Sequence, residues 1–158
     1  MSISERLSED LKKALKAGEK DTLSVIRMIK AAVKNKEIEK GGSLSDEEFY
    51  SVLMSLARQR KESIEQFSKG GRHDLAEKEE RELSITQSYL PRQLTEGELE
   101  EVIKDAIKET GAGSQKDMGN VMKFIMSKIK GQVDGKLVSE LVKKILSASS
   151  ERISGSVG

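Results

Sequence analysis

The sequence offers one group of the kind that acts as a general base at neutral pH. His73, the only histidine, follows Gly70, Gly71 and Arg72 at a point where a helix is expected to begin. A lone imidazole beside a helix start is more often a solvated loop residue than a catalytic base. There is no cysteine, which removes thiolate nucleophiles and sulfur-ligated zinc. We therefore predict no catalytic residue.

A run of carboxylates follows this histidine, formed by Glu77, Glu79, Glu80 and Glu82. Such a run would hold a metal ion more readily if a second histidine or an inward-facing Glu-x-x-His pattern accompanied it, and neither is present. A solvated helix face is the better interpretation. We predict no metal site and no cofactor.

Charges separate along the last third of the sequence. Residues 95–113 hold two lysines against six carboxylates, a local charge of −4, whereas residues 114–146 hold seven lysines against three carboxylates, a local charge of +4. Lys116, Lys123 and Lys130 are seven residues apart. On one helix they would fall within about 40° of one another, an arrangement that suits contact with phosphates.

Glycines accompany these lysines and would let a nucleic-acid backbone approach closely. We therefore predict an RNA-binding face. Its candidate residues are Lys116, Gly119, Lys123, Lys130, Gly131, Gly135, Lys136 and Lys143. Two alternatives stay open: the lysines only keep a helical bundle soluble, or the glycines only cap helices and, at Gly119, admit a packed neighbour.

A secondary basic face occupies one arc of an earlier helix and consists of Arg27, Lys30 and Lys34. Further cations surround the next predicted helix, namely Arg58, Arg60 and Lys61. We interpret both groups mainly as solvated surface and keep the first as a secondary binding candidate.

These side chains must be positioned by helices, because apolar residues recur three and four positions apart throughout and no alternating strand pattern competes. The predicted helices span about residues 4–16, 21–39, 45–69, 74–90, 95–110, 114–129 and 134–146. Capping boxes are predicted at Ser2 with Glu5, Ser45 with Glu48, and Thr95 with Glu98.

The fold class is therefore all-α, with an N-terminal four-helix module and a smaller three-helix C-terminal module. Pro91, the only proline, cannot continue a helix and marks the boundary. We predict domains at 1–90 and 95–147, a linker at 91–94 and a flexible tail at 148–158.

Composition limits the function further. The formal net charge is +1, so attraction to nucleic acid depends on where the charges lie. Aromatic residues make up 3% of the chain, which argues against a base-stacking platform. No stretch approaches the roughly 20 apolar residues of a membrane span, and the first residues lack the apolar segment of a secretory signal. We predict a cytoplasmic protein without membrane contact.

Five segments are distinctive in their order and spacing, and they read LSVIRMIKAAVKNKEI, RQRKESIEQFSKGGRHDLA, YLPRQL, KDMGNVM and KGQVDGKLVSELVKKIL. Together, over roughly residues 7–146, they resemble the YqeY proteins of the GatB/YqeY family. The resemblance implies a C-terminal domain similar to the tail of the glutamine-dependent tRNA amidotransferase B subunit, which is understood to help hold tRNA. It also suggests tRNA as a ligand, and amidotransferase or synthetase components as protein partners.

Amide transfer itself needs an activated nucleophile and a phosphate-binding site. The sequence has neither a Gly-x-Ser-x-Gly elbow nor a Gly-x-x-x-x-Gly-Lys-Ser/Thr loop. We therefore expect a non-catalytic tRNA-binding accessory protein. The alternatives are a helical protein–protein interaction module and an auxiliary component of a carbon–nitrogen ligase that uses glutamine as amido donor.

Overall fold

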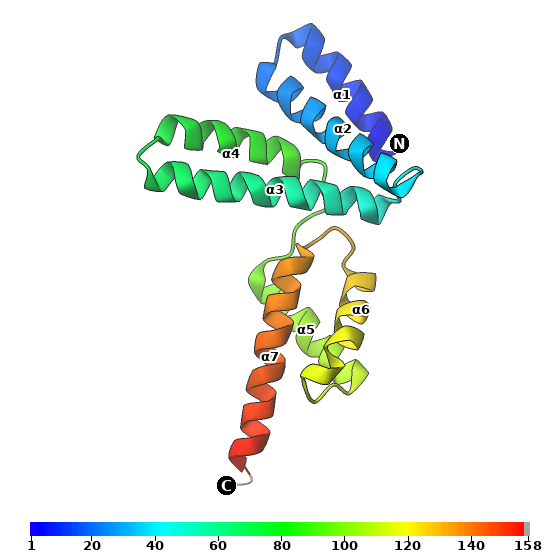
Figure 1. The fold of residues 1–158 in the computed structure, drawn as a ribbon, viewed down its shortest axis with the longest axis vertical. Helices are drawn as coiled ribbons and strands as arrows, with labels where there is room; N and C mark the ends of the chain where they lie inside the picture. Colours follow the sequence, from blue (N-terminus) through cyan, green and yellow to red (C-terminus); the bar gives the residue numbers. More distant parts are fainter. Residues whose placement is uncertain (157–158) are drawn as a thin grey trace. The chain divides into compact units, whose positions relative to one another are not determined.

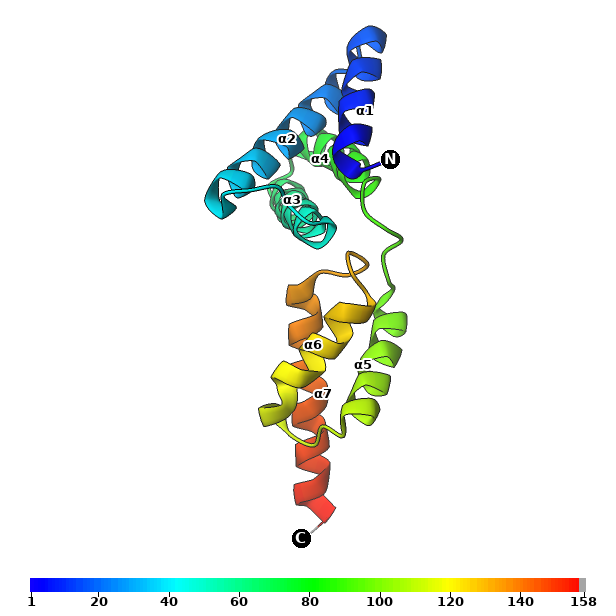
Figure 2. The same cartoon turned by 90° about the vertical axis from the view of Figure 1, so that its right-hand side faces the viewer.

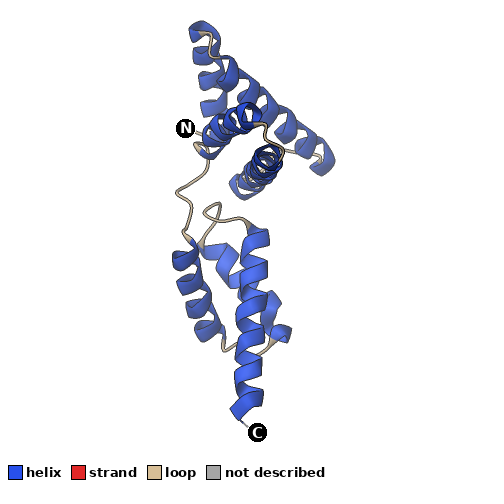
Figure 3. Cartoon of the chain, turned by 90° about the vertical axis from the view of Figure 1, so that its left-hand side faces the viewer, coloured by secondary structure: helices blue, strands red, loops and turns tan. Residues whose placement is uncertain are grey.

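The computed structural model describes residues 1–156, with side chains described as far as residue 148. Within residues 1–156 the chain forms seven α-helices, one short 3-10 helix and no strand (Figure 3). The predicted all-α fold is confirmed. The chain divides into two compact units, the first ending at Pro91 and the second beginning at Arg92.

The N-terminal unit consists of two helix pairs. In Figure 1, α1 lies beside α2 and α3 lies beside α4. The helices are α1 (Ile3–Ala17), α2 (Lys20–Lys40), α3 (Asp46–Lys69) and α4 (His73–Gln87). Their apolar faces meet in one core formed by Leu7, Val25, Ile26, Ile29, Val33, Phe49, Val52, Leu53 and Tyr89.

Local sequence signals explain most of these helix ends. Both halves of the predicted box at Ser2 and Glu5 are present. The box predicted at Ser45 is wrong in one half, since Ser45 Oγ accepts from the Glu48 N–H at 3.2 Å but no bond returns to the Ser45 backbone. The Glu48 carboxylate instead accepts from Lys40 Nζ at 2.7 Å, and this bond lowers the pKa of Glu48.

Helix α4 ends at Gln87, three residues before the predicted end at Leu90. The chain tightens there, because the N–H groups of Tyr89 and Leu90 donate to the carbonyls three residues earlier, at 3.3 and 3.0 Å. The turn directs Tyr89 into the core, where 5% of the residue is exposed. Its hydroxyl donates to Asp10 Oδ2 at 2.5 Å, so the end of α4 is bonded to α1.

In the C-terminal unit, α6 packs against both α5 and α7 (Figure 2). Its elements are α5 (Glu96–Thr110), η1 (Gln115–Asp117), α6 (Met118–Lys128) and α7 (Gly135–Ser156). Both halves of the predicted box at Thr95 and Glu98 are present. The core consists of Leu99, Ile103, Ala106, Val121, Ile125, Ile129, Val133, Val138, Val142 and Leu146.

Two helix boundaries in this unit differ from the prediction. The helix expected over 114–129 opens with the separate 3-10 turn η1, and α7 continues past Leu146 to Ser156. The predicted flexible tail at 148–158 falls mostly on side chains outside the described residues, and residues 157–158 lie outside them altogether.

Candidate nucleic-acid interface

The turn between α6 and α7 is held in place by the segment that precedes α5. Gln93 Nε2 donates to the carbonyl of Gly131 at 2.8 Å, and the Leu94 N–H donates to the carbonyl of Gln132 at 2.8 Å. A further bond closes the turn itself, from the Gln132 N–H to the Ile129 carbonyl at 3.0 Å. The side chains that flank this turn therefore project from a fixed backbone.

The three candidate glycines have different roles. Gly131 has φ of 72°, in the left-handed region that favours glycine. A Cβ atom on Gly135 would lie 3.7 Å from Met126 Cε, an ordinary packing distance. A Cβ atom on Gly119 would meet nothing within 4 Å, so the alternative that Gly119 admits a packed neighbour is wrong. Gly119 is exposed, and no contact with the described residues requires a glycine at this position.

Asp134 lies directly before α7 and accepts hydrogen bonds from two amides of its first turn. The carboxylate accepts from the Lys136 N–H at 3.1 Å, and the Asp134 carbonyl accepts from the Val138 N–H at 3.1 Å. Asp134 therefore caps the start of α7.

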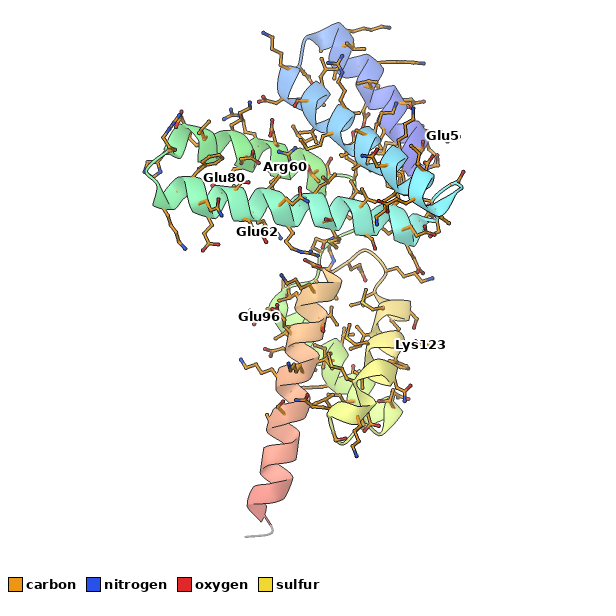
Figure 4. All side chains as sticks on the ribbon, in the orientation of Figure 1. Glu5, Arg60, Glu62, Glu80, Glu96 and Lys123 are labelled. Atoms are coloured by element: carbon orange, nitrogen blue, oxygen red, sulfur yellow. The ribbon has the colours of Figure 1, made fainter. Side chains whose placement is uncertain are left out.

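The candidate lysines Lys116, Lys123, Lys130, Lys136 and Lys143 are all exposed. Lys123 extends outward from α6 (Figure 4). The single helical row predicted from the seven-residue spacing is wrong, because Lys116 lies in η1 and Lys130 lies beyond the end of α6 at Lys128. The structure instead places Lys130 and Lys136 on the two sides of the turn that follows α6.

One lysine of this region is engaged with a ring. Lys128 Nζ lies 4.5 Å from the centroid of Phe124, within the range of a cation–π interaction. Phe124 and Lys128 are four residues apart on α6, and this spacing could have indicated the contact from the sequence.

The acidic helix α5 differs in both charge and pairing. Glu98 accepts from Arg92 Nη2 at 2.7 Å, and this bond, together with a hydrogen bond from the Thr95 N–H, lowers the pKa of Glu98 to about 2. Other carboxylates of α5 are exposed, among them Glu101 and Asp105. Because carboxylates repel phosphates, the candidate interface lies on the side of α6 and α7.

A buried ion cluster in the N-terminal unit corrects the interpretation of Arg60 as solvated. Arg60 is 6% exposed and lies between α3 and α4 (Figure 4). Its Nη1 donates to Glu82 Oε2 at 2.5 Å and to Glu79 Oε2 at 3.1 Å. The prediction that this carboxylate run forms a solvated face is therefore wrong for Glu82, which is 6% exposed.

The residues first considered for catalysis are not brought into one site. His73 is exposed as the first residue of α4, and Glu77 and Glu80 are exposed further along the same helix. No group of three or more potential metal ligands occurs within the described residues.

Among the helices of residues 1–156, none has the length and apolar character to cross a membrane.

The secondary basic face is more exposed at its ends than at its centre. Arg27 and Lys34 are exposed on α2, whereas Lys30 is half-buried and donates to Ser8 Oγ on α1 at 3.2 Å.

Between α2 and α3 lies a groove of about 780 Å³. Its rim charges pair with one another, as in the bond from Lys40 to Glu48, so the groove itself offers little attraction for nucleic acid.

Comparison with known protein families matches residues 4–146 to the family described as Yqey-like protein. The chain therefore belongs to this family, as its residues suggested.

Its relatives include fungal proteins named "Altered inheritance of mitochondria protein 41, mitochondrial". The one from Pyrenophora tritici-repentis is 34% identical over 90% of this chain and 80% of its own length. The one from Saccharomyces cerevisiae is 35% identical over 82% of this chain and 69% of its own length. The match to the Lachancea thermotolerans protein, 42% identical, spans 53% of this chain and 46%, about half, of that protein.

Proposed function

We propose that this chain is a non-catalytic RNA-binding accessory protein that contacts the phosphate backbone of tRNA through its C-terminal unit. The observation that carries the proposal is the pair Lys130 and Lys136, exposed on the two sides of a turn that Gln93 and Leu94 hold in place. A pre-positioned pair of cations loses less conformational freedom on binding than cations on a mobile loop.

Two further features support the same ligand. Lys123 is exposed on the helix that leads into the turn, and the exposed Gly119 lies one turn before it on α6, where a backbone can approach without meeting a side chain. The scarcity of aromatic residues favours contacts to phosphates rather than stacking on bases.

Electrophoretic mobility shift of the full chain with unfractionated tRNA tests the proposal. We expect Lys123→Gln with Lys136→Gln to weaken binding at low salt and to flatten the plot of log affinity against log salt by as much as about 0.9 per lost contact, the value for duplexes.

The matched control removes two lysines from the acidic helix of the same unit, Lys104→Gln with Lys108→Gln, both exposed. Equal binding by the two double variants, or no binding of tRNA by the native chain at low salt, overturns the proposal.

The compartment is also part of the proposal. The names of the relatives place those proteins in mitochondria, which favours a mitochondrial location over the predicted cytoplasmic one. Fractionation of cells that express the tagged full chain tests this. Recovery in the mitochondrial fraction supports it, and recovery only in the cytosol contradicts it.

A further inference from the structure

The most basic segment of the chain lies outside the proposed interface, in α1 and α2. Residues 11–36 hold eight lysines and arginines against two carboxylates, a local charge of +6, which exceeds the +4 of residues 114–146. Of these two carboxylates, Asp21 accepts from Arg81 Nε at 3.3 Å and is therefore already paired. The excess of positive charge stays on the hairpin of α1 and α2.

The structure arranges part of this charge as a straight row on α2. Lys20, Arg27 and Lys34 are exposed and follow one another at seven-residue intervals on one continuous helix. They therefore share one face and span about 21 Å. The regular row that the lysines of the C-terminal unit fail to form is present here.

Within α2, no carboxylate shares the arc of the row. The exposed residues between and beyond its members on the same arc are uncharged: Ser24, Ala31 and Ile38. The last two carboxylates of α2 are not on the arc of the row. Glu39 accepts from Lys36 at 3.3 Å, and Glu37 is half-buried.

Helix α1 widens the basic face. Lys30 donates to Ser8 Oγ, so the face of α1 that carries Ser8 lies beside the row on α2. Lys12 follows Ser8 by one turn and is exposed. Helices α1 and α2 are joined by a tight turn and run antiparallel (Figure 1), so Lys12 lies nearer than Ser8 to the start of α2 along the hairpin.

We infer that this face of α1 and α2, with Lys20, Arg27 and Lys34 at its centre, is a second and independent contact for the phosphate backbone of double-helical RNA. A rigid row of cations complements a polyanion whose charges repeat along a line. The row has no aromatic member, so it contacts phosphates without stacking on bases. The inference rests on the proposed function only in the choice of RNA as the polyanion.

The test measures binding of the full chain to a short fluorescent RNA duplex at several salt concentrations from about 50 mM upward. We expect Lys20→Gln, Arg27→Gln and Lys34→Gln together to weaken binding at low salt on the order of tenfold or more, and to lower the salt slope by roughly one for each lost contact. The control triple variant is Lys13→Gln, Lys61→Gln and Lys78→Gln, three exposed lysines of the same unit off this face.

Equal binding by the two triple variants, or no binding of the duplex by the native chain, overturns the inference. Vesicles of phosphatidylcholine with and without phosphatidylserine form a separate arm, and loss of vesicle binding without loss of RNA binding assigns the face to anionic lipid instead. The C-terminal variant Lys123→Gln with Lys136→Gln is measured in parallel. Because each variant changes one unit, failure of this face and failure of the proposed C-terminal interface give different results.

Discussion

Cationic residues have different roles in the two units of this chain, although they look alike in sequence. Arg60 of α3 is buried and pairs with Glu79 and Glu82 of α4, whereas Lys130 and Lys136 of the C-terminal unit are exposed beside a fixed turn. The first group connects two helices, and its cation is buried. The second lies on the surface, where solvent reaches both side chains.

Loss of the buried cation should have the largest effect. Arg60→Ala leaves the carboxylates of Glu82 and Glu79 without their buried partner, and we expect it to lower the free energy of unfolding by about 3–5 kcal/mol. Urea unfolding followed by circular dichroism measures this. The control is Lys61→Ala, an exposed neighbour, for which about 0.5 kcal/mol or less is expected. Similar values for the two variants would contradict the structural role of Arg60.

The capping box at the start of α5 should have a moderate effect. Thr95 Oγ1 accepts from the Glu98 N–H at 3.2 Å, so Thr95→Ala removes the acceptor and should cost about 1 kcal/mol. Hydrogen exchange of the backbone amides in both units measures the change in each unit separately. Reduced protection confined to residues 1–91 would show that the cap does not stabilise the C-terminal unit.

The ion pair of Arg92 and Glu98 should have a smaller effect, visible mainly at acid pH. Arg92 holds the pKa of Glu98 at about 2 in the folded chain, below its ordinary value of 4.5. The contribution of this group to stability is therefore complete above about pH 5 and is lost as the pH falls toward 2.

An NMR titration of the Glu98 carboxyl measures this shift directly. In Arg92→Gln the midpoint should move up toward 4.5, whereas in Arg72→Gln, which removes the partner of Asp74, it should stay near 2. A midpoint that does not respond to Arg92→Gln would show that the ion pair does not cause the lowered pKa of Glu98.

The exposed lysines should have the smallest effect on stability. Lys123→Gln with Lys136→Gln should change the free energy of unfolding by no more than about 0.5 kcal/mol per substitution, because both side chains are exposed. Thermal unfolding measures it. A loss comparable to that of Arg60→Ala would mean that these lysines are structural and would erase the contrast between the units.

Sequence reasoning succeeded where the determinants are local. The boxes at Ser2 and Thr95 depend on residues a few positions apart. The box at Ser45 failed in one half because Lys40, from the preceding helix, takes the carboxylate of Glu48.

The sites were harder to predict because they depend on tertiary structure. Nothing near Arg60 in the sequence shows that α4 will bury it, since its partners lie 19 and 22 residues away. The lysine row failed because an ideal spacing assumes one continuous helix, whereas η1 and the end of α6 at Lys128 interrupt it. On α2 the sequence predicted a basic face of Arg27, Lys30 and Lys34, whereas the exposed row of the structure consists of Lys20, Arg27 and Lys34.

Photo-crosslinking of the native full chain to tRNA at low salt, with identification of the attached peptides by mass spectrometry, tests the central claim most directly. The account predicts crosslinks in residues 116–143, concentrated around Lys123, Lys130 and Lys136, and lost when salt is raised. Crosslinks confined to the N-terminal unit, or none above a control with bovine serum albumin, would contradict it.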